Sequence, residues 1–275
     1  LVSSAELAAH LDDPVWAVFD CRHDLAQADA GARAYATAHI PGARFLHLDR
    51  DLSAPTSGKN GRHPLPDPQA FMQTLGAAGV DSNNQVIAYD AQTGVYAARL
   101  WWMLRWLGHE NVAVFDGGYA KWTGEARPVT SAVPQPAPVR FAGKPRPIAV
   151  DAENVLSSLG QPGRILVDAR APDRYRGENE TLDPVGGHIP GSINRFFRDN
   201  LGAGACFKSA AELASAYGAL LGDASPDTVV HSCGSGVSAC HNLLAMEIAG
   251  LTGSRLYPGS WSEWCSDPSR PIEKG

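Results

Sequence analysis

The stretch His231-Ser-Cys-Gly-Ser-Gly-Val-Ser-Ala-Cys240 decides the fold that we predict for this 275-residue chain. The apolar run Thr228-Val229-Val230 before it is typical of a short buried strand. The run from Ala239 to Gly250 after it is typical of a helix, with Ser238 as its expected N-cap and Gly250 as its stop. The stretch therefore predicts a strand, a loop and a helix in direct succession.

Cys233 is expected at the carboxyl end of that strand, in a loop with glycines at positions 234 and 236. Such a loop can turn its backbone N–H groups inward, and the positive end of the following helix dipole points the same way. Both features favour an anion at the centre of the loop, so we expect Cys233 to be a nucleophilic thiolate. The alternative is a buried structural cysteine. We prefer the nucleophile because two glycines and two serines within six residues leave space beside a thiol.

The composition excludes several classes of partner. The chain has 23 Lys and Arg against 29 Asp and Glu, a net charge of −6, and no basic run, which argues against nucleic acid and anionic membranes as partners. No apolar run approaches the roughly 18 residues of a membrane span, and no signal peptide is visible. The first residue is Leu1, so removal of a presequence stays open.

The five cysteines are scattered and odd in number, which indicates free thiols in a reducing compartment such as the cytoplasm. Cys233, Cys240 and His241 lack the paired spacing of structural zinc sites. We therefore expect neither a metal nor another cofactor.

Helices and strands alternate through the first half of the chain, which predicts a parallel sheet with helices on both faces. A capping box opens a short helix from Ser3 to His10. The other expected elements are strands at 15–20, 43–49, 85–90 and 111–116, helices at 68–78 and 95–107, and a long loop at 50–66. Residues 128–148 contain six prolines, which is typical of an extended linker.

Four segments of the first half recur in the second half in the same order, at offsets between 142 and 149 residues. The matched pairs are 17–22 with 164–170, 38–43 with 187–192, 86–90 with 229–233, and 115–122 with 257–264. This regularity indicates a tandem duplication. We expect an N-terminal domain at 1–127, the linker at 128–148 and a C-terminal domain at 149–275. Asp90 stands where the second copy has Cys233, so only the second copy can perform thiol chemistry.

The paired D-x-R, H-I-P-G and G-x-W/Y-x-x-W segments, with a single cysteine loop in the second half, resemble the two-domain rhodanese family over almost the whole chain. The loop Cys233-Gly-Ser-Gly-Val-Ser is similar to that of the 3-mercaptopyruvate sulfurtransferases. Thiosulfate sulfurtransferases typically carry Arg and Lys after the cysteine, where this chain has Gly234 and Ser235. The resemblance implies an α/β fold of two tandem rhodanese-like domains, with the second domain catalytic.

The resemblance also implies the reaction. A sulfane sulfur moves from 3-mercaptopyruvate to Cys233 as a persulfide, and then to cyanide or to a thiol acceptor such as thioredoxin or a small thiol. The alternatives are a thiosulfate:cyanide sulfurtransferase and a persulfide carrier without turnover. A phosphatase with a rhodanese-like loop needs an arginine six residues after the cysteine, where this chain has Ala239.

For substrate binding, Arg174 matches the arginine of the family that binds the substrate carboxylate, which a guanidinium can do through two hydrogen bonds. The family's second arginine, nine residues farther on, is Asp183 here. Either Arg176 or Arg195 takes its place, or carboxylate binding is weaker, or the substrate differs. The loop residues that we expect to bind substrate together with Arg174 are Gly234, Gly236, Val237 and Ser238.

The mercaptopyruvate branch of the family is also proposed to use a Ser–His–Asp relay beside the cysteine. The matching residues are Ser235 in the loop, His63 in the long loop of the first half, and Asp49 at the end of an expected strand. Pyruvate departs as an enolate and needs a proton, which a hydroxyl backed by imidazole and carboxylate could supply. The alternative for His63 is a solvated loop histidine.

Overall fold

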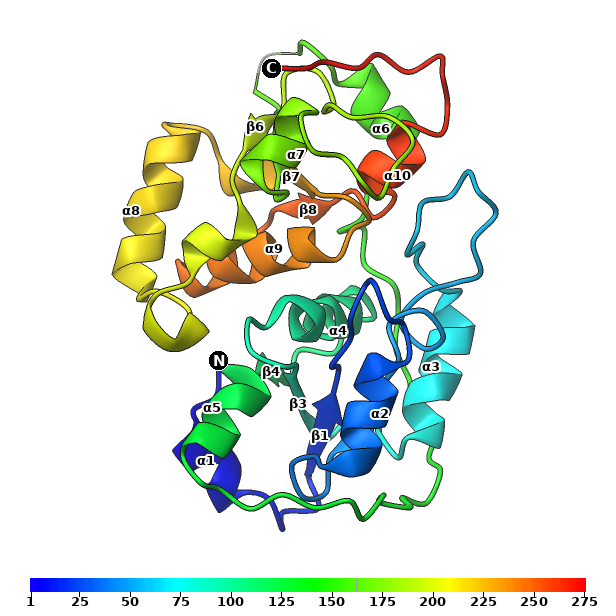
Figure 1. Cartoon of the computed structure of the whole chain (residues 1–275), viewed down its shortest axis with the longest axis vertical. Coiled ribbons are helices and arrows are strands. Elements are labelled where there is room, and N and C mark those ends of the chain that lie inside the picture. Colours follow the sequence, from blue (N-terminus) through cyan, green and yellow to red (C-terminus); the bar gives the residue numbers. More distant parts are fainter. Residues whose placement is uncertain (162) are drawn as a thin grey trace. The chain divides into compact units, whose positions relative to one another are not determined.

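The structure is a computed structural model that describes residues 1–161 and 163–275 (Figure 1). Its residues form two compact units. The first unit comprises Leu1–Ala54, Leu65–Arg146 and Ala203–Cys206, and the second comprises Pro55–Pro64, Pro147–Gly202 and Phe207–Gly275. The proline-rich segment 128–148 contains no helix or strand, apart from an isolated bridge between His39 and Thr130. Most of this expected linker therefore packs as part of the first unit.

The first unit contains a four-stranded parallel sheet with the strand order β2-β1-β3-β4. Its elements are α1 (Ser4–Ala9), β1 (Trp16–Asp20), α2 (Ala30–Thr37), β2 (Arg44–Phe45), α3 (Pro68–Ala77), β3 (Gln85–Tyr89), α4 (Val95–Trp106), β4 (Val112–Val114), α5 (Gly118–Gly124) and the 3-10 turn η2 (Ala203–Ala205). Ser3 caps α1 by accepting a hydrogen bond from the N–H of Glu6 at 3.2 Å. The expected parallel sheet and the helix start are confirmed.

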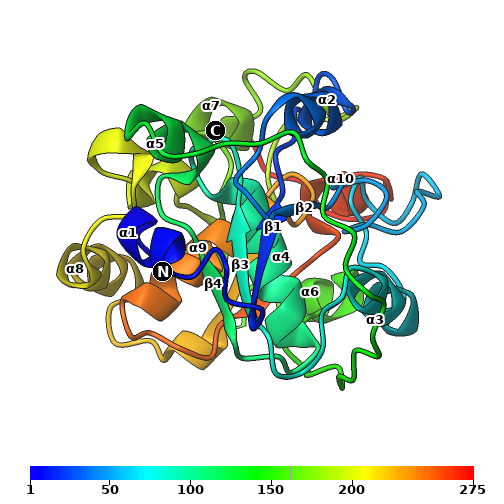
Figure 2. The same ribbon diagram turned by 90° about the horizontal axis from the view of Figure 1, so that it is seen from below.

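Helices cover both faces of the first sheet. Successive strand residues point to opposite faces, so the apolar residues of the strands need a packing partner on each face. Val18 of β1 and Ile87 of β3 pack in one buried cluster with Leu7 of α1 and Trp122 of α5. Helix α4 packs against β3 and β4. Figure 2 shows α1 and α4 on opposite sides of β1 and β3.

The second unit repeats this architecture with the strand order β6-β5-β7-β8, again all parallel. Its elements are α6 (Ala152–Ser157), β5 (Ile165–Asp168), α7 (Pro172–Arg176), β6 (Ile193–Asn194), η1 (Phe197–Asn200), α8 (Ala210–Leu221), η3 (Pro226–Thr228), β7 (Val229–Ser232), α9 (Ser238–Ile248), β8 (Arg255–Leu256) and α10 (Ser260–Trp264). In the described parts of both units, no helix combines the length and the apolar character that crossing a bilayer requires.

Alternation along β5 and β7 builds two separate cores in the second unit. Leu166 and Val230 belong to a cluster with residues of α6 and α10, whereas Val167 and Val229 belong to a cluster with residues of α8 and α9. Figure 1 shows α8 and α9 on one side of this sheet and α6 and α10 on the other. The central strand β7, which leads to the cysteine loop, is therefore buried on both faces.

The repeated D-x-R segments make the same contacts in both copies. Nε of Arg22 donates to both carboxylate oxygens of Asp20 at 3.1 and 2.8 Å, and Nε of Arg170 donates to those of Asp168 at 3.1 and 3.0 Å. Nη2 of each arginine also donates to the carbonyl that precedes the histidine of the H-I-P-G turn, at 2.7 and 2.8 Å. In each copy these hydrogen bonds connect the end of the first strand (β1 or β5) to the H-I-P-G turn.

The prediction that the second strand runs from residue 43 to Asp49 is wrong. Strand β2 contains only Arg44 and Phe45, which pair with Phe19 and Asp20 of β1. The neighbouring strand β1 ends at Asp20, so the chain beyond Phe45 has no partner backbone for a ladder. Asp49 lies in the turn that follows.

Candidate active site

Cys233 directly follows the last residue of β7 and begins the loop that leads to α9. The side chain is 2% exposed, and its Sγ accepts a hydrogen bond from the N–H of Gly236 at 3.1 Å. Gly236 has a φ of +75°, and a Cβ at this position would lie 2.3 Å from the carbonyl oxygen of Pro258. Glycine is therefore what allows this amide to face the sulfur.

The first unit shows what the same loop does around a carboxylate. Asp90 follows β3 as Cys233 follows β7, and the next helix begins five residues later in both copies. The carboxylate of Asp90 accepts hydrogen bonds from the N–H groups of Gln92, Gly94 and Tyr96 at 3.1, 2.9 and 2.8 Å. A strand–loop–helix of this kind can thus surround the group at its first position with amide donors.

The start of α10 holds the backbone of the cysteine loop. The N–H of Cys233 donates to Oγ of Ser260 at 3.0 Å, and the N–H groups of Trp261 and Ser262 donate to the carbonyls of Cys233 and Gly234 at 3.0 and 2.9 Å. Ser260 is fully buried and has a φ of +52°, which is rare for a residue with a Cβ. The repeated segment at 257–264 therefore positions the loop, a role that its sequence alone did not reveal.

The structure brings Ser235 and His63 together although 172 residues separate them. Oγ of Ser235 lies 2.7 Å from Nδ1 of His63, and both side chains are buried. Both residues belong to the second unit, which includes the segment Pro55–Pro64. Asp49 belongs to the first unit, where its N–H donates to Nδ1 of His47 at 3.1 Å. Its part in a relay stays a prediction.

Arg174 lies on α7 and binds the carboxylate of Glu180. Its Nη2 donates to both oxygens of Glu180 at 2.8 Å, and its Nε donates to Oε2 at 3.2 Å. Burial opposes ionisation of Glu180, but the hydrogen bonds from Arg174 and from the N–H of Leu182 outweigh it and lower the pKa of Glu180. The guanidinium that the family resemblance assigns to the substrate carboxylate therefore binds a carboxylate of its own chain.

Arg62 supplies a second cation beside Arg174. Its Nη1 forms an ion pair with the buried carboxylate of Asp183, and burial raises the pKa of Asp183 although Arg62 opposes this shift. A Cβ at Gly234 would lie 2.8 Å from Nη2 of Arg62 and 3.7 Å from both terminal nitrogens of Arg174. Two guanidiniums thus lie next to the second residue of the cysteine loop.

Neither arginine that we weighed as a replacement for the missing second arginine contacts this pair in the described structure. Arg176 binds the exposed carboxylate of Glu178, and Arg195 lies over the ring of Tyr217. Arg62 was not among the residues expected from the sequence, although its position directly before His63 was an available signal.

The prediction that Ser238 caps α9 is wrong. The N-cap is Val237, which makes no side-chain hydrogen bond, and Ser238 is the first residue inside the helix. The turn at Gly236 already brings the chain into the helical direction one residue earlier than expected. Gly250 follows the C-cap Ala249 with a φ of +76°, as a helix stop does.

Comparison with known proteins gives consistent matches. A family model described as "Rhodanese-like domain" matches residues 3–125 and 151–267. A Pseudomonas aeruginosa protein named "Probable 3-mercaptopyruvate sulfurtransferase" is 46% identical over all of this chain and 98% of its own length, and the "Thiosulfate sulfurtransferase" of Bos taurus is 36% identical over 84% of this chain and 78% of its own length. The crystal structure of SseA from Escherichia coli, titled as a 3-mercaptopyruvate sulfotransferase with a "Rhodanese" fold, matches with a TM-score of 0.83 and 32% identity, over 95% of this chain and 98% of its own.

Proposed function

Because the chain belongs to the rhodanese family, we propose that it is a sulfurtransferase that moves a sulfane sulfur from 3-mercaptopyruvate through a Cys233 persulfide to a thiol or cyanide. The observation that carries this proposal is the hydrogen bond from the N–H of Gly236 to Sγ of Cys233. It places an amide donor on the sulfur of the cysteine that directly follows β7. An amide so placed stabilises negative charge on sulfur.

In the first step the thiolate of Cys233 attacks the sulfur of 3-mercaptopyruvate. A sulfur–sulfur bond forms, the carbon–sulfur bond breaks, and its electron pair leaves on carbon as the enolate of pyruvate. The outer sulfur of the persulfide is two bonds from Cβ, as is a carboxylate oxygen of an aspartate. The amides that match those around Asp90 are therefore suited to bind this outer sulfur.

Ser235 and His63 are the groups that we assign to protonating the enolate. Their 2.7 Å contact lets the imidazole replace a proton that the hydroxyl gives up. The family resemblance implies a part in this relay for Asp49 as well. In the second step an acceptor thiolate attacks the outer sulfur and releases Cys233.

The substrate carboxylate is proposed to bind Arg174 and Arg62. Both guanidiniums are engaged by Glu180 and Asp183, whose side chains are 3% exposed. Binding is therefore an exchange of one carboxylate for another, which costs less than desolvating a free guanidinium. The thiol of Cys233 is itself 2% exposed, so the donor reaches the sulfur only when neighbouring side chains move.

Thiosulfate is the second candidate donor. Two guanidiniums beside Gly234 also suit a small dianion, and relatives of 36% identity are named thiosulfate sulfurtransferases.

Thioredoxin or a small thiol is the proposed acceptor. The cytoplasm, a reducing compartment, is the proposed location because the structure describes five free cysteines.

Steady-state turnover with a dithiol acceptor tests the function. We expect a higher kcat/KM for 3-mercaptopyruvate than for thiosulfate. A preference for thiosulfate would overturn the choice of donor. A single stoichiometric transfer without turnover would identify a persulfide carrier instead of an enzyme.

A further inference from the structure

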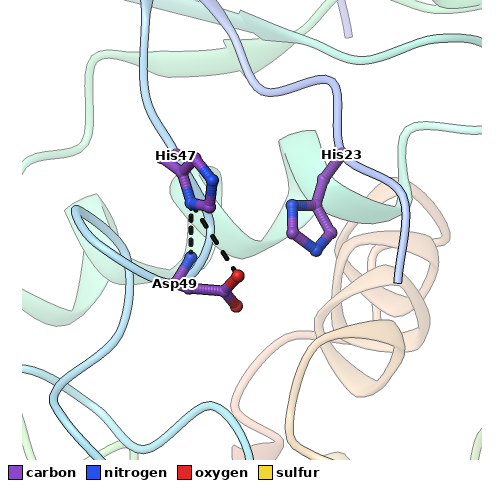
Figure 3. A group of neighbouring side chains, drawn as sticks. All are labelled: His23, His47 and Asp49. Carbon is purple, nitrogen blue, oxygen red and sulfur yellow. Dashed lines mark hydrogen bonds and ion pairs between the residues drawn. The ribbon is translucent and has the colours of Figure 1, made fainter. Parts of the chain in front are cut away.

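Three potential metal ligands converge in the first unit, away from the residues of the cysteine loop in the sequence. His23 lies three residues after β1, and His47 lies two residues after the neighbouring strand β2. Parallel strands end at the same edge of a sheet, so both histidines and the nearby Asp49 meet there. One ligand atom from each residue lies within 4.8 Å of the others (Figure 3).

His47 has the arrangement of a metal-binding histidine. Its Nδ1 accepts a hydrogen bond from the N–H of Asp49 at 3.1 Å and lies 3.9 Å from Oδ2 of the same residue. The lone pair is therefore on Nδ1 and the ring proton on Nε2. Among the described residues the buried Nε2 makes no hydrogen bond, and it lies 3.7 Å from Oδ1 of Asp29. A small shift of Asp29 would bring its carboxylate to hydrogen-bond distance of Nε2, where a metal-bound imidazole usually has its second partner.

His23 faces His47 and packs edge-on against aromatic neighbours. Its ring contacts the ring of His47 edge-on, with centroids 5.6 Å apart, and the ring of Tyr96, with centroids 5.3 Å apart. Burial lowers the pKa of His23, although Asp49 acts in the opposite direction.

We propose that His23, His47 and Asp49 bind a divalent transition-metal ion, with zinc as its representative; Asp49 then serves as a metal ligand in place of the relay role that the family resemblance implies for it. Two imidazoles and one carboxylate suit zinc and its neighbours, whereas magnesium and calcium prefer oxygen ligands throughout. Three protein ligands leave a position for water. His23 follows β1, whereas His47 and Asp49 follow β2. Because the ligands come from two separate segments, the spacing of cysteines and histidines in the sequence did not indicate this site.

The geometry needs only a small closure. Ligand atoms around a tetrahedral zinc lie about 3.3 Å apart, so the separations of up to 4.8 Å must shrink by about 1.5 Å at most. His47 is 4% exposed and provides a fixed anchor, whereas the side chain of Asp49 is 41% exposed and His23 is half-buried. The latter two can rotate toward the ion. The N–H of Asp49 then gives up its bond to His47 and turns to water.

Calorimetric titration with zinc chloride tests the proposal, with the full-length Cys233→Ser protein as the parent because a reactive thiolate itself binds zinc. We expect one zinc ion per chain. His23→Ala should weaken binding at least tenfold, and His47→Gln should do the same. His10→Ala is the matched control, because His10 is a partly exposed histidine outside the cluster, and it should bind zinc like the parent.

Cobalt substitution identifies the ligands independently of affinity. We expect a visible spectrum of nitrogen and oxygen ligation, without the thiolate-to-metal charge-transfer bands that cysteine ligands produce. Circular dichroism of His23→Ala shows whether the variant is folded. The proposal is overturned by the absence of saturable binding, by equal affinity in folded His23→Ala and the parent, or by a thiolate spectrum.

Discussion

The substitution Gly236→Ala tests how the cysteine loop is built. Gly236 has a φ of +75°, and a left-handed conformation costs a residue with a Cβ about 1 to 2 kcal/mol. The new Cβ would lie 2.3 Å from the oxygen of Pro258 and 2.9 Å from its Cα and carbonyl carbon. These are backbone atoms, so relief of the overlap requires a backbone shift, which adds about 1 to 3 kcal/mol. We expect a total destabilisation of about 3 kcal/mol.

The same shift turns the N–H of Gly236 away from Sγ of Cys233. Loss of one donor to a developing anion typically lowers kcat by about a hundredfold or more. At roughly 3 °C per kcal/mol for a protein of this size, the melting temperature should fall by about 10 °C. Differential scanning fluorimetry and steady-state kinetics with 3-mercaptopyruvate and a dithiol measure the two effects.

Gly234→Ala is the matched control in the same loop. Its Cβ would meet Nη2 of Arg62 at 2.8 Å, which is the mobile end of a long side chain, and no positive φ strains the backbone there. We expect a stability change of less than about 1 kcal/mol and an effect on KM more than on kcat. Wild-type stability and kcat in Gly236→Ala, or equal destabilisation by both substitutions, would refute this reasoning.

Three further predictions follow from the site and from the strand that leads to it. Arg174→Ala should raise KM for 3-mercaptopyruvate about tenfold to a hundredfold, the worth of a charged hydrogen bond, and an equal rise for an uncharged sulfur donor would make Arg174 structural. His63→Ala should lower kcat about a hundredfold or more with little change in KM, and a change confined to KM would exclude the relay. Burial lowers the pKa of His231 from 6.5 to about 3, so the unfolded chain takes up its proton first as the pH falls. Stability should be full above pH 6.5 and decrease toward pH 3, by about 2 kcal/mol near pH 5, and chemical denaturation of His231→Leu should lack this component of the acid dependence.

The internal repeat made the fold predictable from the sequence. Two copies of a strand, an H-I-P-G turn and a strand–loop–helix, at nearly constant offset, require two similar sheets, and both sheets have the same parallel strand order. The strand before Cys233 was predictable because it is short and begins with the apolar residues Val229 and Val230, which pack on opposite faces of the sheet. The limits of β2 were not predictable from the sequence. An edge strand ends where its neighbouring strand ends, and the local sequence pattern carries no information on the length of that neighbour.

The contacts of the candidate site were only partly predictable. The pairing of Ser235 with His63 followed from the family resemblance, and the 2.7 Å contact is present. The pairing of Arg62 with Asp183 spans 121 residues and depends on where the segment Pro55–Pro64 packs. Periodicity and local propensity carry no information on such a contact. The hydrogen bond from the N–H of Cys233 to Ser260 was unpredictable for the same reason.

Intact-mass spectrometry tests the central claim most directly. The protein is incubated with 3-mercaptopyruvate in the absence of an acceptor, and peptide mapping locates the added sulfur. We predict a gain of one sulfur atom per chain, on Cys233, that a thiol removes and that Cys233→Ser never shows. Sulfur on another cysteine, or an unchanged gain in Cys233→Ser, would contradict the account.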